Sequence, residues 1–293
     1  MTQWSEVILL VRHSQDFDQP IRIASAMASA WGIRVHVLVD QRLGLSDPQI
    51  EEWLKSLNIP LFSVRTERCT DVIETCLGMS KAPMPQPIVV SSYEASLFQK
   101  EHSIATAGER EGSAHPDPDL VRLIESFENP ILLLRRGIES QWPWPSLAVP
   151  MSGESRCSQA LTVAIEFAQK LSVPIDLIRS LAPSSEAIHG DEVHHELEPM
   201  LEEFITHACP FASPTDRRRI RQMEVVASES AEAFLRHPLV REAGALVVEW
   251  KGVFTAGHAE ILKKILAELS VAVLLVRESA VEVSSLRAGR QLG

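Results

Sequence analysis

An internal repeat constrains the fold of this chain more than any other feature, because a repeated segment implies a repeated structural unit. Residues 21–40 (IRIASAMASAWGIRVHVLVD) align with residues 161–180 (LTVAIEFAQKLSVPIDLIRS) at a constant offset of 140. In both, an apolar segment with helical spacing ends at a small residue, and a β-branched segment follows it. Two further pairs of apolar segments correspond: 6–11 with 146–151, and 130–137 with 271–278.

Each copy of the repeat alternates segments typical of strands with segments typical of helices. The additional strand candidates are 59–65 and 87–92 in the first copy, and 223–228 and 245–250 in the second. The helix candidates between them are 70–80 and 230–244. This alternation favours a parallel sheet, because parallel neighbours need long crossovers and helices supply them.

We therefore predict an α/β protein with two tandem Rossmann-like five-stranded parallel sheets flanked by helices. The expected organisation is a first domain at 1–137, a linker at 138–145, a second domain at 146–280 and a flexible tail at 281–293. Two tryptophans and two prolines in the segment GIESQWPWPS (137–146) indicate a short linker whose rings pack between the domains.

Charge and apolar patterning exclude two classes of partner. The net charge of −11 argues against nucleic acid, and the basic run DRRRIR (216–221) is typical of a solvated surface. The chain begins without the pattern of a signal peptide, and no apolar run approaches the ~20 residues of a membrane span. We expect a cytoplasmic protein that binds no nucleic acid and does not insert into membranes.

The repeated pattern resembles that of the tandem universal stress proteins, in which two copies of one nucleotide-binding-like α/β domain share a chain. Residues 149–154 (VPMSGE) lie where that family has a hydrophobic run ending in Pro-hydrophobic-Asp-Gly-Ser. Residues 257–278 (GHAEILKKILAELSVAVLLVRE) are similar to the family's last helix and strand. The resemblance implies a role in the stress response. It also implies that the halves pair through their apolar fifth strands, since that strand commonly forms the dimer contact in relatives.

The nucleotide-binding motifs of that family are degenerate in this sequence. Binders have an Asp at the end of the first strand, and Arg12 and Ser152 stand there in the two halves. Binders also have a Gly-x-x-Gly-x9-Gly-Ser/Thr loop after the fourth strand. In the second half, Glu249 replaces the first glycine of that loop and only four residues separate the last two. In the first half, the same place reads SSYE (91–94). We therefore expect no bound cofactor, with ATP binding kept as an alternative.

The second half keeps some features of an anion site. Glycine followed by histidine opens its last helix, and a helix N-terminus favours a phosphate or another anion. The candidate nucleotide- or anion-binding residues are Ser152, Gly153, Lys251, Gly252, Gly257 and His258. They support an alternative function, an ATP, adenine-nucleotide or anion sensor that uses the second domain only.

Other motifs carry less weight. The His-rich segment 189–198 contains Glu192 and His195, an i,i+3 pair suited to zinc or nickel, but a solvated helix start is the favoured interpretation. The pair Gly32 and Asp40 lacks the three-glycine turn of a dinucleotide site, and Gly-x-Ser-x-Gly is absent. A weak nucleotide phosphatase therefore remains only a third alternative.

We expect a protein that is not an enzyme and has a regulatory or protective function in the stress response, exerted through protein contacts. Its expected partners are its own second half in an internal pseudo-dimer, a second copy of the chain, and an unknown regulatory protein.

Overall fold

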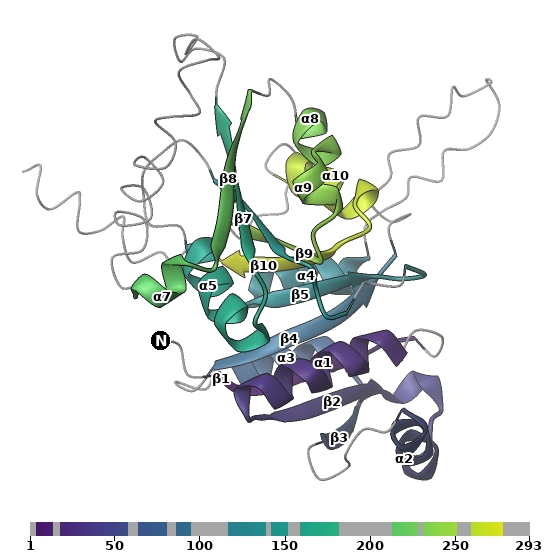
Figure 1. Ribbon diagram of the computed structural model, residues 1–293. Helices are drawn as coiled ribbons and strands as arrows, with labels where there is room; N and C mark the ends of the chain where they lie inside the picture. The colour runs from purple at the N-terminus through teal and green to yellow at the C-terminus, as the bar shows by residue number, and fades with distance from the viewer. Residues whose placement is uncertain are drawn as a thin grey trace, which may run out of the picture.

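One ten-stranded sheet forms the centre of the computed structural model, in the order β3-β2-β1-β4-β5-β10-β9-β6-β7-β8 (Figure 1). The structure describes residues 4–13, 18–57, 64–80, 86–94, 117–138, 142–151, 159–181, 213–227, 231–250 and 259–277. The strands are β1 (Trp4–Val11), β2 (Arg34–Asp40), β3 (Val64–Cys69), β4 (Gln86–Tyr93), β5 (Ile131–Arg135), β6 (Leu147–Met151), β7 (Ile175–Leu181), β8 (Ile220–Ala227), β9 (Ala245–Trp250) and β10 (Ala272–Arg277).

The sheet consists of two parallel halves that meet at one antiparallel seam. All strand pairs within each half are parallel. At the seam, β5 pairs with β10 in antiparallel register, with Leu133 opposite Val273. The predicted α/β class and the predicted pairing of the two final strands are confirmed. The two expected sheets form one continuous sheet, because the apolar edge strands β5 and β10 cover each other.

Helices cover both faces of the sheet, which explains why its central strands are continuous apolar runs. They are α1 (Asp18–Trp31), the 3-10 turn η1 (Gln41–Leu43), α2 (Asp47–Ser56), α3 (Val72–Ser80), α4 (Pro118–Ser126), α5 (Gln159–Leu171), α7 (Pro214–Arg217), α8 (Ala231–Arg236), α9 (Pro238–Arg241) and α10 (Glu260–Glu268). Side chains of α1, α2 and α5 join the core on one face, and those of α3, α4, α8, α9 and α10 join the core on the other.

One predicted strand ends earlier than the strand that the structure describes. The apolar run 59–65 suggested a strand there, whereas the described strand β3 runs from Val64 to Cys69, and residues 58–63 lie outside the described residues. Strand β3 is an edge strand in which Arg65, Thr66 and Arg68 are exposed. An edge strand covered on part of its surface needs few apolar residues, so the apolar run was a poor guide to its position.

The predicted helix over 230–244 is two short helices. Helix α8 ends at Arg236, and α9 begins at Pro238 after the extended residue His237 (φ −62°, ψ 133°). Proline has no N–H and its ring disfavours a helical conformation in the preceding residue, so the helix breaks at this point.

The two tryptophans of the predicted linker segment are packed against other aromatic and apolar groups. Their rings, Trp142 and Trp144, contact each other edge to face, with centroids 5.0 Å apart. Trp144 is buried in the core that also holds α1 and α5, and it lies directly against Gly244. The domain boundaries themselves remain a prediction, and the expected tail at 281–293 lies outside the described residues. Within the part of the chain that the structure describes, no helix has the length and apolarity to cross a membrane.

Candidate functional site

A cavity of about 440 Å³ lies at the carboxyl ends of the first-half strands, beside the start of α4. Strands β1 and β4 are neighbours there, yet α1 after β1 packs on one face and α4 after β4 packs on the other. This is the switch point of the strand order, where open α/β sheets bind their ligands. The cavity volume is in the range typical of small-molecule sites.

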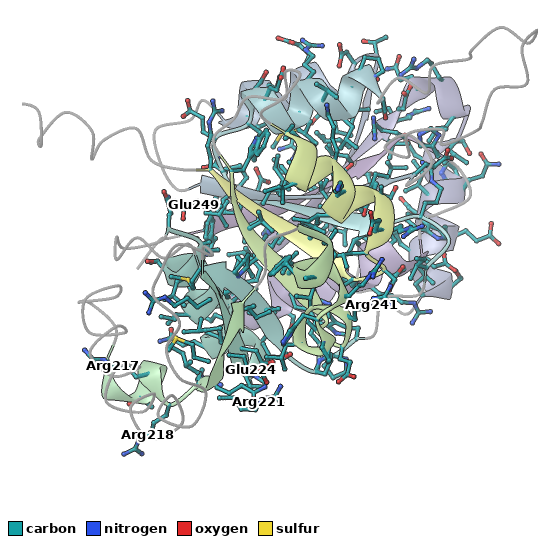
Figure 2. All side chains as sticks on the ribbon, turned by 90° about the horizontal axis from the view of Figure 1, so that it is seen from above. Arg217, Arg218, Arg221, Glu224, Arg241 and Glu249 are labelled. Carbon is teal, nitrogen blue, oxygen red and sulfur yellow. The ribbon has the colours of Figure 1, made fainter. Side chains whose placement is uncertain are left out.

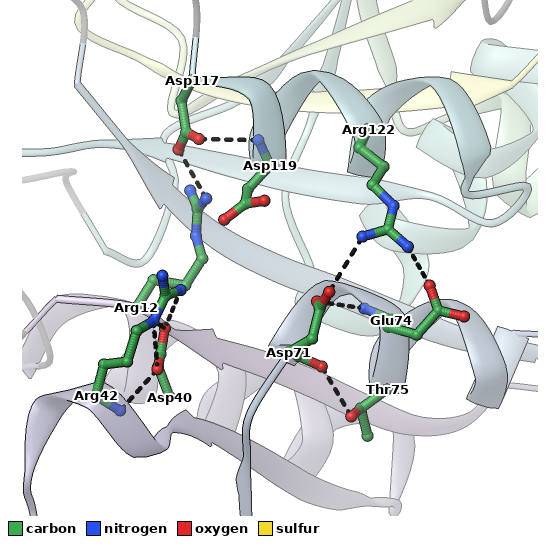
Figure 3. Close-up of polar contacts among 9 residues, drawn as sticks. All are labelled: Arg12, Asp40, Arg42, Asp71, Glu74, Thr75, Asp117, Asp119 and Arg122. Carbon is green, nitrogen blue, oxygen red and sulfur yellow. Dashed lines mark hydrogen bonds and ion pairs between the residues drawn. The ribbon is translucent and has the colours of Figure 1, made fainter.

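Arg12 and Asp117 line this pocket and form an ion pair (Figure 3). The Arg12 side chain is 8% exposed, and its Nη1 donates to Oδ2 of Asp117 at 2.7 Å. Its Nη2 donates to the Ser92 carbonyl at 3.4 Å. Asp117 is also the N-cap of α4, since its Oδ1 accepts the backbone N–H of Asp119 at 3.0 Å. A carboxylate of the chain itself therefore occupies the helix N-terminus that would otherwise attract an anion.

Asp40 and Arg42 form the β2 side of the pocket. The Asp40 side chain is buried, and it accepts hydrogen bonds from Nε (2.9 Å) and Nη2 (2.6 Å) of Arg42. The backbone N–H of Arg42 donates to the same carboxylate at 2.8 Å. These hydrogen bonds, those from the Arg42 guanidinium first, hold the pKa of Asp40 below its usual value although burial opposes them.

Glu94 and Arg136, which directly follow β4 and β5, also line the pocket. Arg136 Nη1 donates to the Glu94 carboxylate, and the Arg136 backbone N–H donates to the Tyr93 carbonyl at 2.7 Å. His13 lies in the same pocket. Burial lowers the pKa of His13 most, and the positive charges of Arg136 and Arg12 lower it further, so its ring is neutral at neutral pH. Burial raises the pKa of the Tyr93 hydroxyl.

Paired charges dominate the lining of the pocket. Each of its three arginines is ion-paired with a carboxylate. The described residues that line it include no Ser, Thr, Cys or Lys, and the other groups there are His13, Tyr93 and four carboxylates. The arrangement can hold a polar ligand by charge-assisted hydrogen bonds.

The sequence-predicted site residues are not brought into this pocket. Ser152, Gly153, Lys251, Gly252, Gly257 and His258 all lie outside the described residues, as does the His-rich segment 189–198. The second-half anion site therefore remains a prediction. Within the described ranges, no cluster of His, Cys, Asp or Glu side chains could hold a metal ion.

The sequence indicated Arg12 only as the residue that replaces the aspartate of nucleotide binders. It did not predict Arg42, Asp117 or Arg136 as pocket residues. A usable signal was present, because a charged residue lies at or near the end of a predicted strand segment at Arg12, Asp40 and Arg136. In a parallel sheet such positions meet at one edge.

The basic run at 216–221 lies away from this pocket. Figure 2 shows Arg217, the last residue of α7, and Arg218 at the outer end of the molecule. Arg218 is exposed, as predicted for a solvated surface. Arg221 instead binds the fully buried Asp176 through Nε (2.9 Å) and Nη2 (2.6 Å). Part of the run therefore neutralises a buried carboxylate of β7.

No protein-family model matches this chain, and no curated protein matches its sequence. Solved structures do match its fold. A universal stress protein from Archaeoglobus fulgidus DSM 4304 gives a TM-score of 0.60 at 11% identity, over 96% of this chain and 100% of that one. A protein described as a universal stress protein, from Pseudomonas aeruginosa UCBPP-PA14, gives 0.58 at 13% identity, over 94% of both chains. A functionally unknown protein from Pseudomonas aeruginosa PAO1 gives 0.57 at 12% identity, over 99% of both. The chain shares the fold of these proteins along nearly its whole length.

Proposed function

We propose that this protein is a non-catalytic regulatory or protective protein of the stress response, which acts through contacts with a partner protein and needs no bound cofactor. Its fold, shared with universal stress proteins over nearly the whole chain, supports this class. The observation that carries the non-catalytic part is the ion pairing of the pocket, where Arg12, Arg42 and Arg136 each have a carboxylate partner.

This pairing matters because a hydrolase of nucleotides needs cationic groups aimed at a phosphoryl group and a base aimed at water. Here the cationic groups face the chain's own acids. Asp117 caps α4, so a phosphate at that helix N-terminus would meet a negative charge. His13 is the one imidazole among the described lining residues, and it provides a sharp test of the proposal.

The catalytic question is tested by incubating the purified chain with ATP and Mg²⁺ and measuring released phosphate. We expect the same background rate for the wild-type chain and for the His13→Ala and Asp40→Asn variants. A saturable rate that is lost in His13→Ala would overturn the non-catalytic assignment.

The regulatory question is tested in cells of the source organism. Deletion of the gene should reduce survival under at least one stress of a panel covering heat, oxidation, starvation and acid, and the wild-type chain should restore it. Cross-linking under that stress should recover a partner that binds the purified chain directly. Full survival of the deletion strain across the panel would contradict this part of the proposal.

A further inference from the structure

We propose that the first-half pocket binds a small zwitterion of the amino-acid class, with a carboxylate and an ammonium group, and not a nucleotide. This inference goes beyond the proposed function and does not depend on it, because a regulatory protein need not bind a small molecule. It rests on the distribution of charge in the pocket.

Both signs of charge line the pocket in nearly equal number. Three arginines face four carboxylates around one neutral imidazole. A polyanion such as ATP meets more negative than positive side chains there, so its net electrostatic gain is small. A zwitterion carries no net charge, and each of its ends can contact side chains of the opposite sign.

The anionic end is expected beside Arg12, Arg136 and His13. Arg12 and Arg136 line the pocket together with His13, and after burial, the largest cause, their positive charges lower the pKa of that imidazole. Arg12 is nine-tenths buried, and the contacts to Asp117 and Ser92 use two of its five N–H groups. A ligand carboxylate can accept hydrogen bonds from the remaining donors.

The cationic end is expected beside Asp119 in the first turn of α4. Figure 3 shows Asp119 next to Asp117, with its carboxylate outside the hydrogen bonds drawn. Among the described residues, the Asp119 carboxylate has no hydrogen-bond or ion-pair partner, although its backbone N–H binds Asp117. It lines the pocket, and its charge adds a small part to the raised pKa of Arg42, which the hydrogen bond to Asp40 raises most. An ammonium group at this position would pair with it.

The same two acids disfavour a nucleotide. Phosphates bind helix N-termini through free N–H groups and a favourable dipole. At α4 the Asp117 carboxylate already accepts the Asp119 N–H, and Asp119 adds a second negative charge in the first turn. A phosphate there would have to displace one carboxylate and approach another.

The test is isothermal titration of the full chain with the twenty L-amino acids, glycine betaine, ATP and AMP. We expect at least one amino acid or glycine betaine to bind with a Kd below about 1 mM. Two analogues of the ligand that binds serve as comparisons: one lacks the amino group and the other lacks the carboxylate. Each should bind about tenfold more weakly, since each loses one charged contact. Absence of binding by every zwitterion at 10 mM, or tighter binding of ATP, would overturn the proposal.

The Asp119→Asn variant tests the cationic end. It should weaken the zwitterion about tenfold and leave the deaminated acid unaffected. Glu128→Gln is the matched control, because Glu128 is exposed just beyond α4 and outside the pocket, and it should change neither affinity. Equal affinity of Asp119→Asn and the wild-type chain would contradict the assignment. The phosphate-release assay above is independent of this result, so failure of one proposal is distinguishable from failure of the other.

Discussion

Arg135 of the first half donates a hydrogen bond from Nη1 to the carbonyl of Leu269 in the second half, at 3.0 Å. Leu269 is the C-cap of α10, and Arg135 is the last residue of β5. The reciprocal contact exists across the seam: Arg277 of β10 donates to the carbonyls of Glu125 (3.0 Å) and Phe127 (3.4 Å) at the end of α4. Because helix C-termini carry partial negative charge and unpaired carbonyls, each half supplies a cap to the other.

These reciprocal caps should contribute measurably to stability. We expect Arg135→Met and Arg277→Met each to lower the free energy of unfolding by about 1 to 2 kcal/mol, because each leaves partly buried carbonyls without a charged donor. Methionine retains much of the apolar stem, so urea unfolding reports mainly the lost hydrogen bonds. Arg122→Met is the control: Arg122 is exposed and pairs with Asp71 and Glu74, so its loss should cost about 0 to 1 kcal/mol. Equal losses in all three variants would contradict this account.

Gly244 should not tolerate a methyl group. A Cβ at this position would lie 2.3 Å from Cβ of Trp144, whose side chain is buried. We expect Gly244→Ala to reduce stability by about 1 to 3 kcal/mol through overpacking and to change the tryptophan fluorescence. Gly78→Ala is the matched control, since no atom lies within 4 Å of its added Cβ in α3. That variant should be stabilised by about 0.5 to 1 kcal/mol, because alanine favours a helix interior. An unchanged melting temperature for Gly244→Ala would show that Trp144 can move.

The fold was predictable from the sequence where the chain repeats itself. The offset of 140 residues identified equivalent helices and strands in both halves, and the apolar final strands correctly indicated the β5–β10 seam. The later part of the edge strand β3 was not predicted, because its residues Val64–Cys69 are mostly polar. Burial on two faces leaves a clear apolar signal, whereas an edge position leaves a weak one.

The pocket was harder to predict because its contacts join distant parts of the chain. Arg12 and Asp117 are 105 positions apart, and they meet only because β1 and β4 are neighbours in the sheet. The glycine-loop pattern of nucleotide binders instead predicted a candidate anion site in the second half. A sequence motif identifies a site only where the residues that a known ligand requires are present. This pocket has Arg12 where the nucleotide-binding motif has an aspartate, so the motif does not identify it.

The electrostatics of the pocket can be measured at His13. The positive charge of Arg136 disfavours the protonated imidazole, so Arg136→Met should raise the pKa of His13 in an NMR titration. Burial, the largest cause of the lowered pKa, remains in this variant, so a part of the shift should persist. Arg122→Met, outside the pocket, should leave the His13 titration unchanged. A His13 curve unaffected by Arg136→Met would show that the two side chains are not close in solution.

The Asp40–Arg42 contact should make stability depend on pH in the acid range. The pKa of Asp40 is lower in the folded chain than the usual value near 3.8, so its contribution to stability is present above that usual value. It is lost as pH falls through the folded pKa, because protonation removes the acceptor for Arg42. Urea unfolding between pH 7 and pH 3 should therefore show a decline in the free energy of unfolding below about pH 5.

This decline should be shallower in Asp40→Asn, which is already destabilised at pH 7. Asp71, whose pKa is lowered chiefly by the Glu74 N–H, keeps some slope in that variant. The exposed Glu51→Gln control should follow the wild-type curve, and an identical slope in Asp40→Asn would show that the Arg42 contact contributes nothing to it.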